Sequence, residues 1–182
     1  MRNEEILLKY KFCPLCGTTL VEKYSWDEGG VPYCEKDDIM FFDIPKPCIV
    51  VAVLKGNKIL LLKQSYIYKN SKVLVSGYVS VGETLEDAVL REVKEETGIT
   101  IGDIKYLGSQ CIKSKELLMI AFMAKYVEGD IQKSSEVEWV EWENINNALC
   151  EMTEDIIGKN IVKKVLEEIS YKGTSAYSCE VK

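Results

Sequence analysis

The sequence predicts an α/β domain preceded by a small cysteine-bearing unit. Apolar, β-branched runs that are typical of strands alternate with segments whose apolar residues recur at helical spacing, and together they indicate the domain. Residues 10–40 differ, because they hold three Cys and no sustained apolar periodicity, so this stretch needs something other than a hydrophobic core to hold it. With 182 residues, the chain has room for one domain and a small appendage.

The boundary between the two parts is expected at Pro45 and Pro47, since Pro interrupts regular structure. We therefore expect an N-terminal segment with the small unit over residues 1–43, a domain over 44–171 and a flexible tail over 172–182.

The elements of the domain follow in order. A hairpin is expected over residues 48–63, because two apolar runs flank the turn signal Gly56-Asn57. A helix is expected over 84–97, with Thr84 as its N-cap and Gly98 as its C-terminal cap. Strands over 104–110, 117–127 and 137–142 and an amphipathic helix over 154–170 complete the order.

The composition excludes several kinds of chemistry. The chain has no His, so Ser-His-Asp and Cys-His catalysis and His metal sites are all ruled out. The net charge of -6 argues against a general surface for duplex nucleic acid. No apolar run approaches the roughly 18 residues of a membrane span, and the N-terminus lacks the layout of a secretion signal. We expect a cytoplasmic protein that does not enter a membrane.

Carboxylates crowd one face of the predicted helix over 84–97. Glu92 lies three residues before Glu95 and four before Glu96, where like charges destabilise a helix. A hard divalent cation such as Mg²⁺ or Mn²⁺ would offset this repulsion and would bridge to the phosphate oxygens of a substrate. Arg91 could orient Glu83 or another Glu through a bidentate contact. The alternative is an acidic, solvated helix face without function.

The run from Gly77 to Ile99 resembles the Nudix hydrolase signature: Gly, five residues, Glu, seven residues, then Arg-Glu-apolar-any-Glu-Glu-any-Gly-apolar. Every specified position is matched. The resemblance implies an α/β/α sandwich with a mixed sheet between the helices. It also implies a Mg²⁺- or Mn²⁺-dependent hydrolase that splits a nucleoside diphosphate linked to another group.

The resemblance further implies roles for single residues. Glu95 is expected either to ligate the metal or to activate the attacking water, and Glu136 is the best match to a distal ligand, with Glu138 as the alternative. The expected metal ligands are Ser76 (through its backbone carbonyl), Glu92, Glu96 and Glu136, and the expected catalytic residues are Glu95, Arg91 and Glu83.

The cysteines of the first segment have the spacing of a zinc ribbon. Cys13 and Cys16 are followed by Cys34, and Asp37 stands where a fourth Cys is expected. Three thiolates and one carboxylate can hold Zn²⁺. A redox pair is a lesser alternative, because no βαβ pattern surrounds these residues. The main alternative is a ribbon without metal, held by the packing of Tyr24, Trp26 and Tyr33.

A zinc ribbon directly before a Nudix domain resembles the NADH pyrophosphatase branch, some of whose members remove NAD caps from RNA. The chain begins just before the ribbon, so we expect it to lack the N-terminal domain of that branch. Tyr78 stands where the branch has an aromatic residue that stacks on adenine, and Phe42 where it has a substrate-side Tyr, although burial in a core is favoured for Phe42. The branch carries a sequence motif for substrate specificity. Gln110 matches one residue of this motif, but Cys111 stands where its aromatic segment begins.

The function implied by the resemblance is cleavage of the diphosphate of a dinucleotide or nucleoside diphosphate derivative. NAD(H) is the first expected substrate, and ADP-ribose or a nucleoside triphosphate is the alternative. A module that binds a nucleotide without cleaving it is a further alternative. Capped RNA is the one nucleic acid partner considered, and a homodimer stays open because family members often dimerise.

Overall fold

The structure is a computed structural model that describes residues 10–64 and 66–175. The chain divides into two compact units, Met1–Ile44 and Pro45–Lys182.

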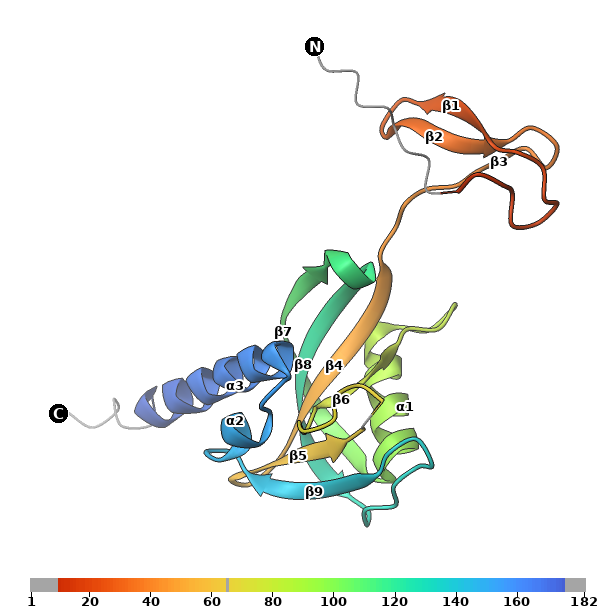
Figure 1. The fold of residues 1–182 in the computed structure, drawn as a ribbon. Coiled ribbons are helices and arrows are strands. Elements are labelled where there is room, and N and C mark those ends of the chain that lie inside the picture. Colours follow the sequence, from red (N-terminus) through yellow and green to blue (C-terminus); the bar gives the residue numbers. More distant parts are fainter. Residues whose placement is uncertain (1–9, 65, 176–182) are drawn as a thin grey trace. The chain divides into compact units, whose positions relative to one another are not determined.

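The first unit is a three-stranded antiparallel sheet in the order β1-β2-β3 (Figure 1). Its strands are β1 (Val21–Ser25), β2 (Gly29–Cys34) and β3 (Ile39–Met40). Its buried cluster is very small and consists largely of cysteines: Cys13, Leu20 and Cys34 are buried, with Cys16 and Phe41 partly buried against them. A core of this size buries too little apolar surface to hold a unit of this length by itself.

The second unit is built on a six-stranded sheet in the order β7-β8-β4-β5-β9, with β6 also paired to β4. Strands β4 and β8 run parallel and all other pairs are antiparallel, so the expected mixed sheet is confirmed. The strands are β4 (Lys46–Lys55), β5 (Lys58–Lys63), β6 (Val75–Tyr78), β7 (Thr100–Ile112), β8 (Leu117–Glu128) and β9 (Trp139–Asn144).

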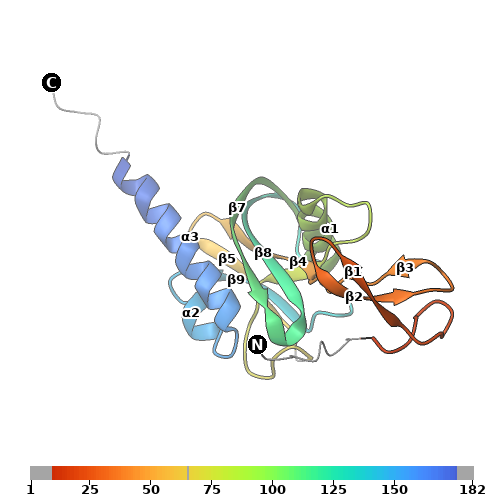
Figure 2. The ribbon, with the colours of Figure 1, turned by 90° about the horizontal axis from the view of Figure 1, so that it is seen from above.

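Helices cover both faces of this sheet, which confirms the expected α/β/α sandwich (Figure 2). Helix α1 (Leu85–Thr97) lies on one face, and α2 (Ala148–Glu151) and α3 (Ile156–Ser175) lie on the other. A short 3₁₀ turn, η1 (Lys113–Lys115), joins β7 to β8. Within the described ranges, no helix combines the length and the apolar character that crossing a membrane requires.

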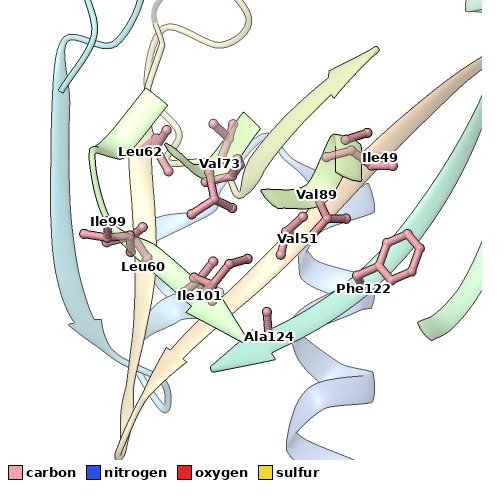
Figure 3. Close-up of a cluster of buried hydrophobic side chains, with 14 of the residues drawn as sticks. Ile49, Val51, Leu60, Leu62, Val73, Val89, Ile99, Ile101, Phe122 and Ala124 are labelled. Carbon is pink, nitrogen blue, oxygen red and sulfur yellow. The ribbon is translucent and has the colours of Figure 1, made fainter. Parts of the chain in front are cut away.

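Strand β4 explains why the sandwich has two cores. Its residues alternate between the faces, as a strand requires. Ile49, Val51 and Val53 join the cluster under α1, part of which Figure 3 shows. The intervening residues Val50, Ala52 and Leu54 join the cluster under α2 and α3. Because both faces are covered, the strand is apolar almost throughout, as in the buried strands of other α/β proteins.

Helix α1 begins and ends where the sequence predicts. The Thr84 hydroxyl accepts a hydrogen bond from the backbone N–H of Asp87 at 3.1 Å, which caps the first turn. Gly98 ends the helix in the left-handed region at φ 76°, and a Cβ there would lie 2.8 Å from the Cβ of Gln132. Both the backbone conformation and the close contact therefore require glycine at this position.

Several features differ from the sequence expectation, among them β9, which was expected over 137–142 and runs from Trp139 to Asn144. Strand β6 and helix α2 were not predicted, because each is only four residues long. Strand β7 runs from Thr100 to Ile112 and not over 104–110, because it continues through an irregularity between Gly102 and Lys105. Helix α3 continues to Ser175, so residues 172–175 of the expected tail are helical. Residues 1–9 of the expected N-terminal segment and 176–182 of the expected tail lie outside the described residues.

The sandwich model predicts a large difference between two Leu→Ala substitutions. Leu60 is fully buried under α1, whereas Leu90 on α1 is 41% exposed. Leu60→Ala should lower the free energy of unfolding by about 2 to 5 kcal/mol, because it leaves a cavity, and Leu90→Ala by less than about 1 kcal/mol. Urea denaturation measures both, and equal losses would contradict the described core.

Candidate functional site

The acidic helix face meets strand β6 at Gly77. A Cβ placed on Gly77 would lie 1.9 Å from the Cδ atom of Glu92, so the Glu92 carboxylate occupies the space that any other side chain would need. Gly77 pairs with Ile49 of β4, at the centre of the sheet. The missing side chain therefore lets a carboxylate of α1 lie directly against the sheet.

Arg91 links the carboxylates to one another. Its Nε and Nη2 atoms donate to the two carboxylate oxygens of Glu83 at 2.6 and 2.9 Å. Its Nη1 atom donates to Glu92 at 2.8 Å and to Glu95 at 3.0 Å. Nη2 also donates to the backbone carbonyl of Tyr78 at 3.0 Å. One guanidinium thus orients three carboxylates and ties α1 to β6, as a planar, bidentate donor can.

Glu83 is held as an anion. Besides Arg91, the backbone N–H of Ser80 donates to its carboxylate at 3.0 Å. The hydrogen bonds from Arg91, followed by the one from Ser80, lower the pKa of Glu83 to about 2. With both oxygens engaged, Glu83 is suited to position Arg91.

Glu96 is the most deeply buried of the acidic residues, with 6% of its surface exposed. One of its oxygens accepts a hydrogen bond from Nε2 of Gln64 at 2.8 Å. Among the described residues the other oxygen, Oε2, has no hydrogen-bond partner although it is buried. Burial raises the pKa of Glu96 to about 7, partly offset by the Gln64 hydrogen bond. A buried acceptor without a partner is costly, so this oxygen fits a site that a cation completes.

Acidic residues of this region line a cavity of about 590 Å³. Glu92 and Glu96 line it together with Glu136, and we call it the carboxylate cavity. Burial raises the pKa of Glu92 as well, an effect that the hydrogen bond from Arg91 opposes. With Asp155, which also lines it, four acidic residues from distant parts of the chain share this cavity, which matches the oxygen-rich donor set that Mg²⁺ and Mn²⁺ prefer.

The other expected site residues divide into two groups. Ser76 and Tyr78 line the carboxylate cavity, and Tyr78 is 57% exposed. Gln110 lies on β7 and lines a separate hollow. Phe42 belongs to the first unit and is 45% exposed, so the core burial favoured for it is wrong. Glu138 does not line the carboxylate cavity, and its backbone N–H donates to the carbonyl of Lys63.

Two residues of the site were missed from the sequence. Gln64 follows the apolar strand β5 and is 1% exposed. A polar residue that directly continues a buried strand is a usable signal, because buried amides need partners. Tyr66 lines the carboxylate cavity with 70% of its surface exposed, and it comes from a loop that shows no motif.

The cysteines of the first unit lie together with Asp37. One ligand atom from each of Cys13, Cys16, Cys34 and Asp37 lies within 4.8 Å of the other three. The Cys16 and Cys34 sulfurs are 3.6 Å apart, and the Cys13 and Cys34 thiols donate to Asp37 Oδ2 at 3.2 and 3.3 Å. A tetrahedral zinc site with Zn–S bonds of about 2.3 Å has sulfurs about 3.8 Å apart, so the spacing fits such a site.

Two of the three rings expected to hold a ribbon without metal are exposed, and only Tyr33 is half-buried. Tyr24 is 76% exposed and Trp26 is 88% exposed, so neither ring contributes a core. Burial raises the pKa of the Cys34 thiol to about 11, whereas thiol donors, with Cys16 first, lower the pKa of Asp37. The cluster therefore pairs a carboxylate anion with three thiols that can be deprotonated when a metal binds.

Comparisons with known proteins were made for both sequence and fold. The family model described as the NUDIX domain matches residues 45–165. The chain is 33% identical over 161 residues to the NAD-capped RNA hydrolase NudC of Vibrio cholerae, covering 88% of this chain and 59% of that protein. It is 34% identical over 146 residues to NudC of Klebsiella pneumoniae, covering 78% of this chain and 55% of that protein. The chain thus spans little more than half the length of these relatives.

Solved structures share the fold. A NUDIX hydrolase from Nitrosomonas europaea superposes with a TM-score of 0.75 at 22% identity, covering 89% of this chain and 93% of that one. The NUDIX domain of Shewanella oneidensis NrtR complexed with ADP ribose superposes with a TM-score of 0.61 at 18% identity, covering 75% of this chain and 94% of that one. At these identities the likeness establishes the architecture alone.

The burial of Glu96 predicts an unusual pH dependence in metal-free protein. Its pKa is about 7 in the folded state and near 4.5 in the unfolded chain, so the folded state binds more protons between these values. Stability should therefore fall as pH rises from about 4.5 to 7, by about 3 kcal/mol at most.

Urea denaturation in the presence of a chelator measures this loss. Glu96→Gln removes the titrating group while its amide oxygen can still accept the bond from Gln64. The variant should lose less stability than the parent over the same pH range. Parallel pH profiles for the two proteins would show that Glu96 titrates in its ordinary range.

Proposed function

Because this chain belongs to the NUDIX family, we propose that it is a Mg²⁺- or Mn²⁺-dependent diphosphohydrolase that cleaves the diphosphate of a dinucleotide or nucleoside diphosphate derivative. The observation that carries the proposal is the buried Glu96 oxygen, which no described residue hydrogen-bonds, in a cavity shared with Glu92 and Glu136. Such a cluster of carboxylates is unfavourable without a cation and well suited to one.

The metal would be held by Glu92, Glu96 and Glu136, joined by the backbone carbonyl of Ser76. All four residues line the carboxylate cavity. When bound, a divalent cation neutralises the diphosphate and lowers the pKa of a bound water. Glu136 is preferred to Glu138 as the distal ligand, because only Glu136 lines the cavity.

The protein's own groups would orient and deprotonate the attacking water. Glu95 does not itself line the carboxylate cavity, but Arg91, which does, donates to it at 3.0 Å, so this 60% exposed side chain is accessible and oriented beside the cavity. We assign Glu95 as the group that takes the proton or, in the alternative role, as a further ligand. Arg91 and Glu83 would act as positioning residues, since their mutual contacts fix the other carboxylates.

NAD(H) is the favoured substrate. Two sequence relatives are named as NAD-capped RNA hydrolases, which extends the proposal to NAD-capped RNA as a second substrate. Tyr78 would supply a stacking platform for a base, because its exposed ring lines the carboxylate cavity. Gln110 and Phe42 remain proposed substrate contacts. ADP-ribose and nucleoside triphosphates are the alternative substrates.

A structural Zn²⁺ is proposed for the first unit, bound by Cys13, Cys16, Cys34 and Asp37. The support is the spacing of these ligand atoms and the small size of the apolar cluster around them. The metal would supply the cohesion that the exposed Tyr24 and Trp26 do not.

A hydrolysis panel with Mg²⁺ and Mn²⁺ tests the proposed activity. NADH, NAD⁺, ADP-ribose, diadenosine polyphosphates, dGTP and an NAD-capped RNA are compared with product identification. NADH should be cleaved with water to AMP and reduced nicotinamide mononucleotide. Glu95→Gln and Glu96→Gln should each lower turnover by about 10²- to 10⁴-fold.

Glu86→Gln is the matched control, because Glu86 lies exposed in the first turn of the same helix and outside the cavity. It should keep near-normal turnover. Normal turnover in both Glu95→Gln and Glu96→Gln would refute the assigned roles. Tight nucleotide binding without products would indicate a sensor in place of a hydrolase.

Elemental analysis tests the zinc proposal. The purified chain should contain about one Zn²⁺ per molecule, and Cys34→Ser should lower this content several-fold, since the ligand set loses a thiolate. Cys111→Ser is the control, because Cys111 is exposed and outside the cluster. A parent protein free of zinc after purification without chelators would contradict the proposal.

A further inference from the structure

A second hollow adjoins the carboxylate cavity on the α3 side of the sheet. It has a volume of about 380 Å³ and lies between β7 and α3. Val50, Met119 and Ile157 line both spaces, so the two share a wall. Because it is lined by Lys163 and Lys164, we call it the lysine hollow.

Strand register aligns the two spaces across the sheet. Cys48 of β4 pairs with Tyr78 of β6 on one side and with Met119 of β8 on the other. Met119 in turn pairs with Gln110 of β7. Paired residues point to the same face, so these four side chains form one row about 14 Å long, from three interstrand steps of about 4.8 Å. Tyr78 and Gln110 thus mark the two ends of one continuous row.

The lysine hollow is polar, whereas the middle of the row, formed by Cys48 and Met119, is apolar. Cys48 is buried and Met119 packs with the apolar cluster under α3. The hollow beyond them offers hydrogen-bonding groups on Gln110 and Asn160 besides its two lysines. A space with cationic and amide donors next to an apolar floor suits a phosphate attached to a sugar.

The charged groups that line the lysine hollow leave the Lys163 ammonium available to bind an anion. Lys164 donates to the backbone carbonyl of Leu107 at 3.2 Å. Glu167 lines the hollow as well, but no ion pair joins it to Lys163 within the described part of the chain. The whole chain carries a net charge of -6, whereas the hollow is lined by two lysines and one glutamate, so the local charge has the opposite sign.

We propose that the lysine hollow is a second subsite that binds a phosphate carried on the ribose of the substrate, beyond the diphosphate that is cleaved. This inference rests on the proposed function. A nucleoside that stacks on Tyr78 can direct such a phosphate along the row toward Lys163. A 3′-phosphodiester of an RNA chain and the 2′-phosphate of a dinucleotide share this chemistry.

Equilibrium binding tests the subsite without catalysis. In low salt with Mg²⁺, adenosine 3′,5′-bisphosphate and adenosine 2′,5′-bisphosphate are compared with AMP by calorimetry. At least one bisphosphate should bind about three- to fivefold more tightly than AMP, as expected for one partly exposed ion pair. Lys163→Gln should abolish this preference and leave the affinity for AMP unchanged.

Lys125→Gln is the matched control. Lys125 lines neither space and pairs with Asp103 at 2.6 Å near the other end of β8. It should retain the preference for the bisphosphate. A parent protein that binds both bisphosphates no better than AMP, or a preference that survives in Lys163→Gln, would overturn the proposal.

The two bisphosphates and two substrates identify the source of the phosphate. Preference for the 3′ isomer, with faster cleavage of NAD-capped RNA than of NADH, supports an RNA chain in the subsite. Preference for the 2′ isomer, with faster cleavage of NADPH, supports a phosphorylated dinucleotide. If no dinucleotide is cleaved while the Lys163-dependent preference persists, the proposed hydrolase function fails and the subsite stands.

Discussion

The contacts of Arg91 are the constraint on which the site depends. Glu92 and Glu95 of α1 and Glu83 just before the helix are brought together, and a single guanidinium offsets their repulsion while fixing their directions. The same group reaches the carbonyl of Tyr78, so the helix and the strand β6 are held in one arrangement. These carboxylates are therefore held in place without a cation, which would reduce the reorganisation that the proposed metal binding and hydrolysis require.

Local signals predicted much of the fold and the acidic part of the site. The capped helix α1, the hairpin of β4 and β5 and the long strand β8 are each determined by their own residues. What the sequence could not give depends on tertiary pairing. Strand β6 is too short to show a period, and the partnership of Gln64 with Glu96 joins residues 32 positions apart. The separation of Gln110 from the carboxylate cavity follows from the order of strands in the sheet.

The two units are stabilised by different means. The sandwich buries apolar residues on both faces of β4, so its stability comes from packing over a large area. The first unit buries a handful of side chains, and its most buried groups are thiols. Loss of apolar volume is therefore the main threat to the sandwich, whereas oxidation of the cysteines threatens the first unit.

Strand β4 pairs over a longer stretch with β8 than with β6, so β6 separates from the sheet more easily than β8 does. Its partner β8 runs alongside from Lys46 to Leu54, whereas β6 pairs only from Cys48 to Val51 and β5 only at the far end. Opening β6 therefore breaks few backbone hydrogen bonds and leaves the long β4–β8 ladder intact. Amide hydrogens of β6 would exchange with solvent before those of β8, and the contact of Arg91 with the carbonyl of Tyr78 supplies part of the hold that the short β6 ladder lacks.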